Sequence, residues 1–250
     1  MRATGKPREV ILLIAPPGAG KSFQLIKVCE YLKEFGIKMH AIDLEDKLEA
    51  TLVSTGGIPK NMNLFIATDW EEVKKSLDEI EKECKPDEWI AVDRIDLAWP
   101  DVQRWYTQMK FQEELSERMM KKAMEMQKAS MFLPRFDKSS WQVINEQYDT
   151  FMMSLLHKSK CNILLTAGIR GIDEDNPLDV FASLHVAPRG QKELQHQPHS
   201  ALLLHQKKRG KDLSWHMTTG KDLIGREYFD SEELFDFGLQ YLANVAKYPK

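Results

Sequence analysis

The strongest indication of a fold class in this chain is the stretch Ala15-Pro16-Pro17-Gly18-Ala19-Gly20-Lys21-Ser22. It follows the apolar run 10–14 (VILLI) and precedes an apolar pattern at helical spacing between Phe23 and Leu32. A strand, a glycine-rich loop that ends in Gly-Lys-Ser and a helix together form the context of a phosphate-binding loop. Ala15 stands where this motif usually begins with glycine, and alanine fits that position if its φ is negative. We therefore predict a nucleotide-phosphate site at this loop.

Each residue type in the loop matches a part of a bound nucleotide. Gly18 and Gly20 let backbone N–H groups turn toward a phosphate that a Cβ would obstruct, and the following helix adds its positive N-terminal end. Lys21 is expected to reach the β- and γ-phosphates, and the Ser22 hydroxyl to bind Mg²⁺. The predicted nucleotide-binding set is Pro17, Gly18, Ala19, Gly20, Lys21, Ser22 and Phe23.

Composition and length indicate a single α/β domain over residues 1–250. Of the 250 residues, 42% are hydrophobic and 29% charged, which is typical of an ordinary globular domain. The formal net charge of −3 does not indicate a general affinity for nucleic acid, so a nucleic-acid surface would have to be a local patch.

The cysteines and the apolar runs indicate the cellular compartment. Cys29, Cys84 and Cys161 lie in apolar segments without metal-like spacing, a pattern typical of buried, reduced thiols. No run approaches the roughly 18 apolar residues of a membrane span. We expect a soluble, cytoplasmic protein, located in the host cytoplasm if it is phage-encoded.

Apolar runs and helix signals predict strands that alternate with helices, as in a parallel sheet. Three consecutive strands then follow, so that edge of the sheet should be antiparallel or mixed. The fold class expected is a three-layer α/β P-loop domain with a mainly parallel sheet and antiparallel C-terminal strands. The predicted strands are 10–14, 37–43, 63–67, 89–93, 162–167, 180–186, 201–206 and 213–218, and the helices after the first are 70–85, 141–158 and 232–246.

Residues from about 100 to 140 interrupt this alternation as a helical, methionine-rich insertion. Over 103–128 the spacing predicts one long helix. One interpretation, which we favour, is a helix packed on the sheet; the other is an arm that docks another subunit or partner, since methionine suits adaptable surfaces. The apolar stripe consists of Met109, Phe111, Leu115, Met119, Met120, Met124, Met126 and Met131.

Carboxylates follow two of the predicted strands and complete the candidate site. Asp93 closes the strand Trp-Ile-Ala-Val-Asp and is the best second ligand for Mg²⁺, with Asp96 as the alternative. Glu45 comes just after the strand 37–43 and is placed either to activate the attacking water or to be a solvated loop acid.

This order of motifs resembles the RecA-like ATPase core, and most closely the phage-type nucleotide-binding ATPases that act in single-strand annealing and recombination. The resemblance covers roughly residues 8–98 and 141–226, although only the phosphate-binding loop is highly specific. It implies that Glu45 is the catalytic base of ATP hydrolysis and that the protein works as an oligomer.

The same resemblance makes two further suggestions about site residues. The polar sensor of the family falls near Gly168, so Thr166 or Arg170 would have to replace it. Lys221 and Arg226 loosely match the basic residues that RecA-like proteins insert into a neighbour's nucleotide site, where a cation stabilises transition-state charge.

The segment 185–211 is the one basic patch and the candidate for contact with DNA, which the resemblance implies is single-stranded. An ordinary solvated hairpin is the competing interpretation. The pair His196-x-x-His199 could suggest zinc, but no cysteine accompanies it and prolines interrupt the segment, so we expect no metal there. The basic residues are Arg189, Lys192, Lys207, Lys208, Arg209 and Lys211, against Glu193 as the acidic one.

Together these features predict a Mg²⁺-dependent ATP hydrolase that acts on DNA as an oligomer, in recombination, annealing or repair. One alternative is a DNA-packaging or helicase-type motor. Another is a nucleotide-gated switch or assembly protein with slow turnover, which the glycine at the sensor position favours. A kinase is less expected, because no arginine-rich lid segment follows the loop.

Overall fold

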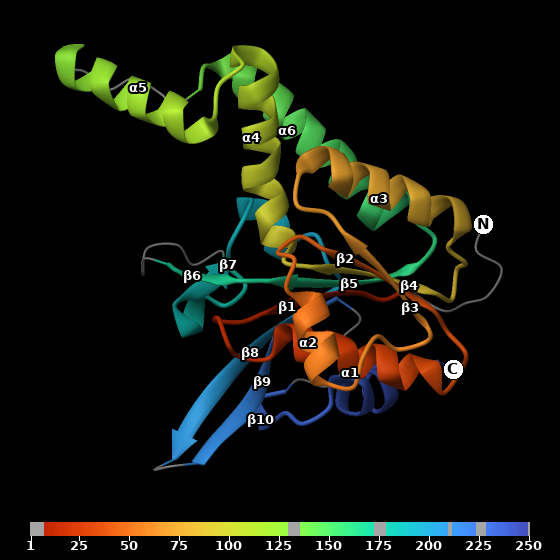
Figure 1. Cartoon of the computed structure of the whole chain (residues 1–250). Helices are drawn as coiled ribbons and strands as arrows, with labels where there is room; N and C mark the ends of the chain where they lie inside the picture. The colour runs from red at the N-terminus through yellow and green to blue at the C-terminus, as the bar shows by residue number, and fades with distance from the viewer. Residues whose placement is uncertain (1–7, 130–135, 173–178, 210–211, 224–228, 250) are drawn as a thin grey trace.

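The computed structural model describes residues 8–129, 136–172, 179–209, 212–223 and 229–249. Its centre is an eight-stranded sheet in the order β10-β9-β8-β1-β5-β4-β2-β3 (Figure 1). The strands are β1 (Val10–Ile14), β2 (Met39–Asp43), β3 (Met62–Ile66), β4 (Trp89–Asp93), β5 (Asn162–Ala167), β8 (Ser200–Arg209), β9 (Asp212–Asp222) and β10 (Glu232–Glu233).

Strands β8, β1, β5, β4, β2 and β3 are parallel, whereas β9 and β10 pair antiparallel. This confirms the predicted α/β class, with a mostly parallel sheet and antiparallel C-terminal strands. Because the carboxyl ends of parallel strands meet at one edge, the loops after β1, β2, β4 and β5 converge there. Strand β5 lies between β1 and β4.

Helices cover both faces of the sheet, as a buried parallel sheet requires (Figure 1). Side chains of β1 alternate between two hydrophobic clusters: Ile11 and Leu13 belong to one, and Leu12 and Ile14 to the other. The first cluster contains residues of α1 (Lys21–Lys33), α2 (Leu48–Ser54) and the π-helical turn η5 (Gly238–Ala243). The second contains residues of α3 (Trp70–Glu83), α4 (Ala98–Phe111) and α6 (Lys138–Met153).

Two predicted elements in the C-terminal third are wrong. The expected strand 180–186 contains the 3₁₀ turn η3 (Ala182–Leu184), since His185 takes a left-handed φ of 53° that no strand accommodates. The chain then forms β7 (Val186–Pro188), which pairs with β6 (Ile169–Gly171) in a separate two-stranded sheet.

The expected helix 232–246 is wrong in its first half. Glu232 and Glu233 pair with β9 as β10, and Ser231 before them has a φ of 60°. The Gln240 side chain then accepts the N–H groups of Phe235 and Asp236, so the helical turn η5 starts only at Gly238.

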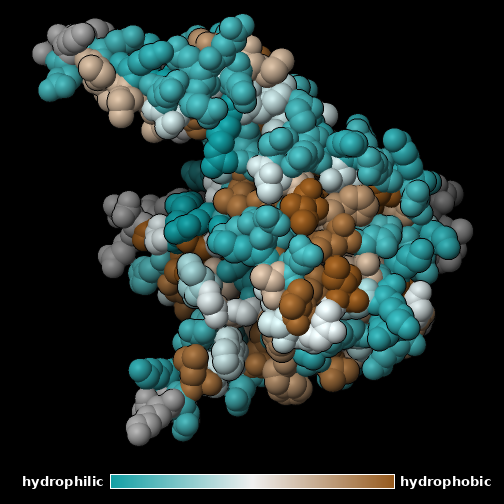
Figure 2. Space-filling model, in the orientation of Figure 1, coloured by the Kyte–Doolittle hydropathy of each residue, from teal (hydrophilic) through white to brown (hydrophobic). Residues whose placement is uncertain are grey.

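The methionine-rich insertion is two helices rather than one. Gln112 ends α4 with a left-handed φ of 55°, and α5 (Leu115–Ala129) follows. Helix α5 makes its main contacts with α4 and projects away from the sheet (Figure 1). Its apolar side chains lie among hydrophilic ones on this arm (Figure 2), and Met120 and Met124 are 68% and 54% exposed. The favoured interpretation, a helix packed on the sheet, is therefore wrong for α5, whereas α4 packs in the second cluster through Val102 and Tyr106.

The cysteines also differ from the expectation of three reduced thiols. Cys84 and Cys161 form a disulfide across a sequence separation of 77 residues, while Cys29 is a buried free thiol.

Three short helical turns complete the fold: η1 (Ile95–Leu97), η2 (Ser154–Lys158) and η4 (Lys192–Gln195). Over the described part of the chain, no helix has the length and apolar character needed to cross a membrane.

Candidate nucleotide site

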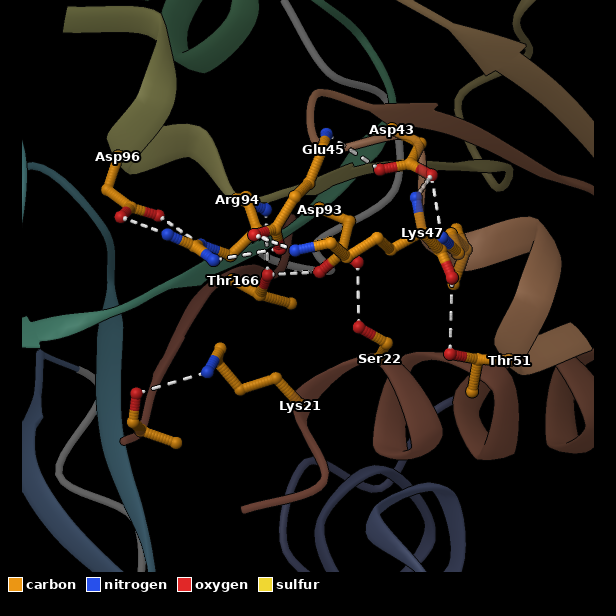
Figure 3. A network of polar contacts seen from close by, with 12 residues as sticks. Lys21, Ser22, Asp43, Glu45, Lys47, Thr51, Asp93, Arg94, Asp96 and Thr166 are labelled. Carbon is orange, nitrogen blue, oxygen red and sulfur yellow. Dashed lines mark hydrogen bonds and ion pairs between the residues drawn. The ribbon is translucent and has the colours of Figure 1, made fainter. Parts of the chain in front are cut away.

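The glycine-rich loop after β1 lies at the carboxyl edge of the sheet, beside the ends of β4 and β5 (Figure 3). Gly18 and Gly20 have φ values of 75° and 85°, a region that side chains with a Cβ rarely adopt, so glycine is needed at both positions. Lys21 is buried and its Nζ donates to the carbonyl oxygens of Ala15 and Pro16, at 3.1 and 3.2 Å. Burial lowers the Lys21 pKa, and the nearby positive charge of Arg94 adds to this effect.

Ser22 lies in the first turn of α1 and Asp93 at the end of β4, and their side chains meet directly. The Ser22 hydroxyl donates to Asp93 Oδ2 at 2.8 Å, and the Thr166 hydroxyl donates to Asp93 Oδ1. Asp93 is only 2% exposed, and this burial raises its pKa even though the two hydroxyls stabilise the carboxylate. A hydroxyl and a desolvated carboxylate at this spacing are oxygen ligands of the kind that Mg²⁺ uses.

Arg94 links the acidic residues of the site and was not singled out by the sequence analysis. It has a left-handed φ of 65°, and its guanidinium binds Asp96 through two bonds, of 2.9 and 3.0 Å. Its Nη1 also donates to Glu45 Oε2 at 2.8 Å. Asp96, the alternative metal ligand, is thus the partner of Arg94. The one signal in the sequence was the acid–base–acid alternation Asp93-Arg94-Ile95-Asp96.

Glu45 lies in this network and is held by two cations. Besides Arg94, Lys47 Nζ contacts Glu45 Oε1 at 2.8 Å. Partial burial would raise the Glu45 pKa, but the bonds and charges of Lys47 and Arg94 outweigh it, so the pKa is lowered. The fully buried Asp43 fixes the turn that carries Glu45, because its carboxylate accepts the N–H groups of Glu45, Lys47 and Leu48.

The β8–β9 hairpin supports the glycine-rich loop from the other side. Gln206 Nε2 donates to the Gly18 carbonyl at 2.9 Å. The indole of Trp215, which is 38% exposed, lies 3.7 Å from where a Cβ on Gly20 would stand. The sequence placed both residues in predicted strands but had no signal that these strands would lie beside the loop.

Of the two residues expected to replace the sensor, Thr166 lies in the network around Asp93 and Arg170 lies at the surface. Thr166 joins the network, where its hydroxyl also accepts the Arg94 N–H at 2.9 Å. Arg170 is exposed on β6. At Gly168 an added Cβ would lie 3.2 Å from both Arg189 Cδ and Asp96 Oδ2, so side chains from two other segments fill the space that a sensor would use.

Lys221 does not join the network around Lys21. Its register partner Ala201 pairs with Leu12, the middle residue of β1, and not with the carboxyl end of that strand. Its Nζ donates to the carbonyls of His196 and Pro198, at 2.6 and 2.9 Å, and burial lowers its pKa. Arg226, its predicted companion, lies outside the described residues.

The predicted basic patch 185–211 occupies two elements rather than one loop. Arg189 and Lys192 are exposed next to β7 and in η4. Lys207 and Lys208 belong to the distal part of β8, where the expected hairpin is present. The Arg209 side chain and Lys211 lie outside the described part. Among the predicted nucleotide-binding residues, Phe23 is 38% exposed on α1.

Comparison with known proteins identifies no relative of this chain. No protein-family model matches the chain, and no curated protein is significantly similar to it in sequence. The arrangement of Lys21, Ser22, Asp93 and Glu45 and the resemblance of the motif order are therefore the features that indicate a function.

Proposed function

We propose that this chain is a RecA-like P-loop ATPase that binds and hydrolyses ATP with Mg²⁺ and acts on DNA as an oligomer, in recombination, annealing or repair. The observation that carries the proposal is the 2.8 Å contact between Ser22 Oγ and Asp93 Oδ2. These residues are 71 positions apart, yet they meet directly beside Lys21, at the carboxyl edge where α/β proteins bind nucleotides.

The residues present fit a magnesium ion and a triphosphate. Ser22 and Asp93 would hold Mg²⁺, which supplies positive charge to neutralise the phosphate oxygens. Lys21 would exchange the carbonyls of Ala15 and Pro16 for the β- and γ-phosphates. Because those two bonds satisfy Lys21 without an ionic partner, a phosphate is the better acceptor.

Glu45 is the residue we assign to the attacking water. Its lowered pKa leaves it ionised at neutral pH but makes it a weaker base, so Glu45 would act on water only after release from the cations that lower its pKa. Arg94 and Lys47 bind both of its oxygens in this state, so Glu45 becomes available when a nucleotide competes for those cations.

A nucleotide-gated switch is the second candidate, and a specific observation favours it. The carboxylate of Glu45 is occupied by two ion pairs, and Gly168 offers no side chain to contact the γ-phosphate. Both features predict slow turnover unless a partner or DNA rearranges the network.

The DNA and oligomer parts of the proposal draw on the resemblance. The exposed cations Arg189 and Lys192 lie close in sequence to Gly190, and Arg189 borders Gly168 next to the network. A nucleic-acid backbone bound there would lie near the nucleotide site, which gives a route for DNA to affect hydrolysis.

The test is steady-state ATP hydrolysis with Mg²⁺, measured with and without single-stranded DNA, on the wild type and two variants. Lys21→Ala removes the phosphate contact, and Glu45→Gln removes the base while keeping the shape. We expect DNA to stimulate the wild type, and each variant to lose at least about 100-fold in turnover.

Glu49→Gln is the matched control, because Glu49 is exposed on α2 and makes the same charge change four residues away. It should hydrolyse ATP at the wild-type rate. If the wild type binds ATP tightly but turns it over slowly, at a rate that DNA does not change, the proposal of a DNA-stimulated hydrolase is overturned and the nucleotide-gated switch remains. Absence of any ATP binding would overturn both.

A further inference from the structure

A second polar cluster lies at the opposite, amino edge of the same sheet. It combines His40 near the start of β2, Glu88 just before β4, and Cys84 at the end of α3. His40 and Glu88 are 3% and 6% exposed, and Cys84 is partly exposed. The network around Lys21 uses none of these residues.

The three side chains converge on one point. His40 Nε2 lies 3.2 Å from Glu88 Oε2, and one ligand atom from each of the three residues lies within 4.8 Å of the others. Ligands bound to zinc at about 2.0–2.3 Å in a tetrahedron lie about 3.3–3.8 Å apart. The His40–Glu88 distance is already close to that value.

Neighbouring groups hold both side chains in place. Asn63 Nδ2 donates to the other ring nitrogen, His40 Nδ1, at 3.3 Å, and Glu88 Oε2 accepts the Lys85 N–H at 3.0 Å. This amide donor places the proton of neutral His40 on Nε2, toward Glu88, so metal binding through Nε2 requires the proton to move to Nδ1 and the Asn63 amide to turn its oxygen toward it.

Cys161 offers a fourth ligand through its bond to Cys84, although its sulfur is not among the ligand atoms that lie within 4.8 Å of one another. Its sulfur is bonded to that of Cys84 and lies 3.2 Å from the Lys85 carbonyl, while the Cys84 sulfur lies 3.7 Å from the same oxygen. As a disulfide the two sulfurs are poor ligands, because zinc binds the thiolate. After reduction they would provide two soft ligands beside an imidazole and a carboxylate, a set that suits Zn²⁺ and not Mg²⁺.

We propose that the reduced protein binds one Zn²⁺ through His40, Cys84, Glu88 and Cys161, and that the disulfide is the metal-free, oxidised form of this site. A dithiol such as dithiothreitol reduces the disulfide by giving two electrons and two protons, and becomes a cyclic disulfide itself. Zn²⁺ then replaces the two thiol protons, which pass to solvent. The bound ion joins the end of α3 to β2 and to the start of β5.

The test is titration of the full chain with Co²⁺, a spectroscopic substitute for Zn²⁺, before and after reduction by dithiothreitol and its removal under anaerobic conditions. We expect the reduced protein to bind one Co²⁺ with thiolate-to-metal charge-transfer absorption, and Zn²⁺ to displace it. The oxidised protein should show no such absorption. Cys84→Ser and His40→Gln should each lower the affinity at least about 100-fold.

Cys29→Ser is the matched control, since Cys29 is a buried thiol outside the cluster, and it should bind Co²⁺ like the wild type. Wild-type affinity in Cys84→Ser, or no uptake by a reduced chain that keeps its far-ultraviolet circular dichroism, would overturn the site. If reduction unfolds the chain, refolding with Zn²⁺ under reducing conditions must restore that spectrum, and failure to do so overturns it as well.

Discussion

The two edges of the parallel sheet carry polar clusters of different chemistry, although the same strands, β2 and β4, connect them. At the carboxyl edge, Asp43 and Asp93 end these strands among hydroxyls and cations. At the amino edge, His40 and Glu88 lie near the sulfur of Cys84, which is bonded to that of Cys161. Oxygen ligands beside Lys21 suit Mg²⁺ and phosphate, whereas imidazole and thiolate suit Zn²⁺. The donor types, and not the strands, therefore decide which ion each edge prefers.

Of the three variants that compare the two edges, Asp93→Asn should have the largest effect, and it should change ion binding only at the carboxyl edge. Mg²⁺ should increase the affinity of the wild type for ATP. Because Asp93→Asn removes a charged ligand, we expect that increase to be smaller by about tenfold or more, measured by ATP titration with and without Mg²⁺. Co²⁺ binding at the amino edge of the reduced protein should not change. A variant that kept full Mg²⁺ enhancement would contradict the assignment of Asp93.

The same variant should stabilise the nucleotide-free protein. Burial raises the Asp93 pKa, so the stability given by its protonated form is present below the ordinary pKa near 4 and is lost as pH rises through the raised value. At pH 7.5 asparagine avoids the buried charge, and we expect Tm to rise by about 2–4 °C, equivalent to about 1 kcal/mol. The gain should disappear at low pH.

Arg94→Gln tests the electrostatics of the carboxyl edge with a smaller effect. The wild-type Glu45 pKa is lowered by Lys47 and Arg94 against the effect of partial burial. Without Arg94 that pKa rises, so the acidic limb of the pH–rate profile of ATP hydrolysis should move to higher pH, by less than about one unit. A profile that keeps its acidic limb while the rate changes would show that Glu45 is not the titrating group.

His196→Gln should have the smallest effect. His196 is exposed, so the free energy of unfolding should change by less than about 0.5 kcal/mol, measured by urea denaturation. Metal uptake by the reduced protein should also stay at the wild-type level. A loss of metal binding would place the site at the His196-x-x-His199 motif and not at the amino edge.

Much of the carboxyl edge could be predicted because its signals are local. Glycine at two positive-φ positions, a lysine and serine at a helix start, and carboxylates at strand ends are all read from neighbouring residues. The role of Arg94 could not be predicted, because only its left-handed backbone brings its guanidinium to both Glu45 and Asp96. The sequence also has no local signal that would place Gln206 and Trp215 against the loop.

Short-range signals along the chain were enough to predict the α/β class, the strand–loop–helix around Lys21 and the positions of Asp93 and Glu45 after strands, since hydrophobic periodicity and turn chemistry act over short stretches. The exposure of α5 and the turn within residues 180–186 became visible only in the three-dimensional structure. It alone also brought His40, Cys84, Glu88 and Cys161 together. The physical reason is that strand order and helix docking create contacts between distant residues, which no spacing along the chain encodes.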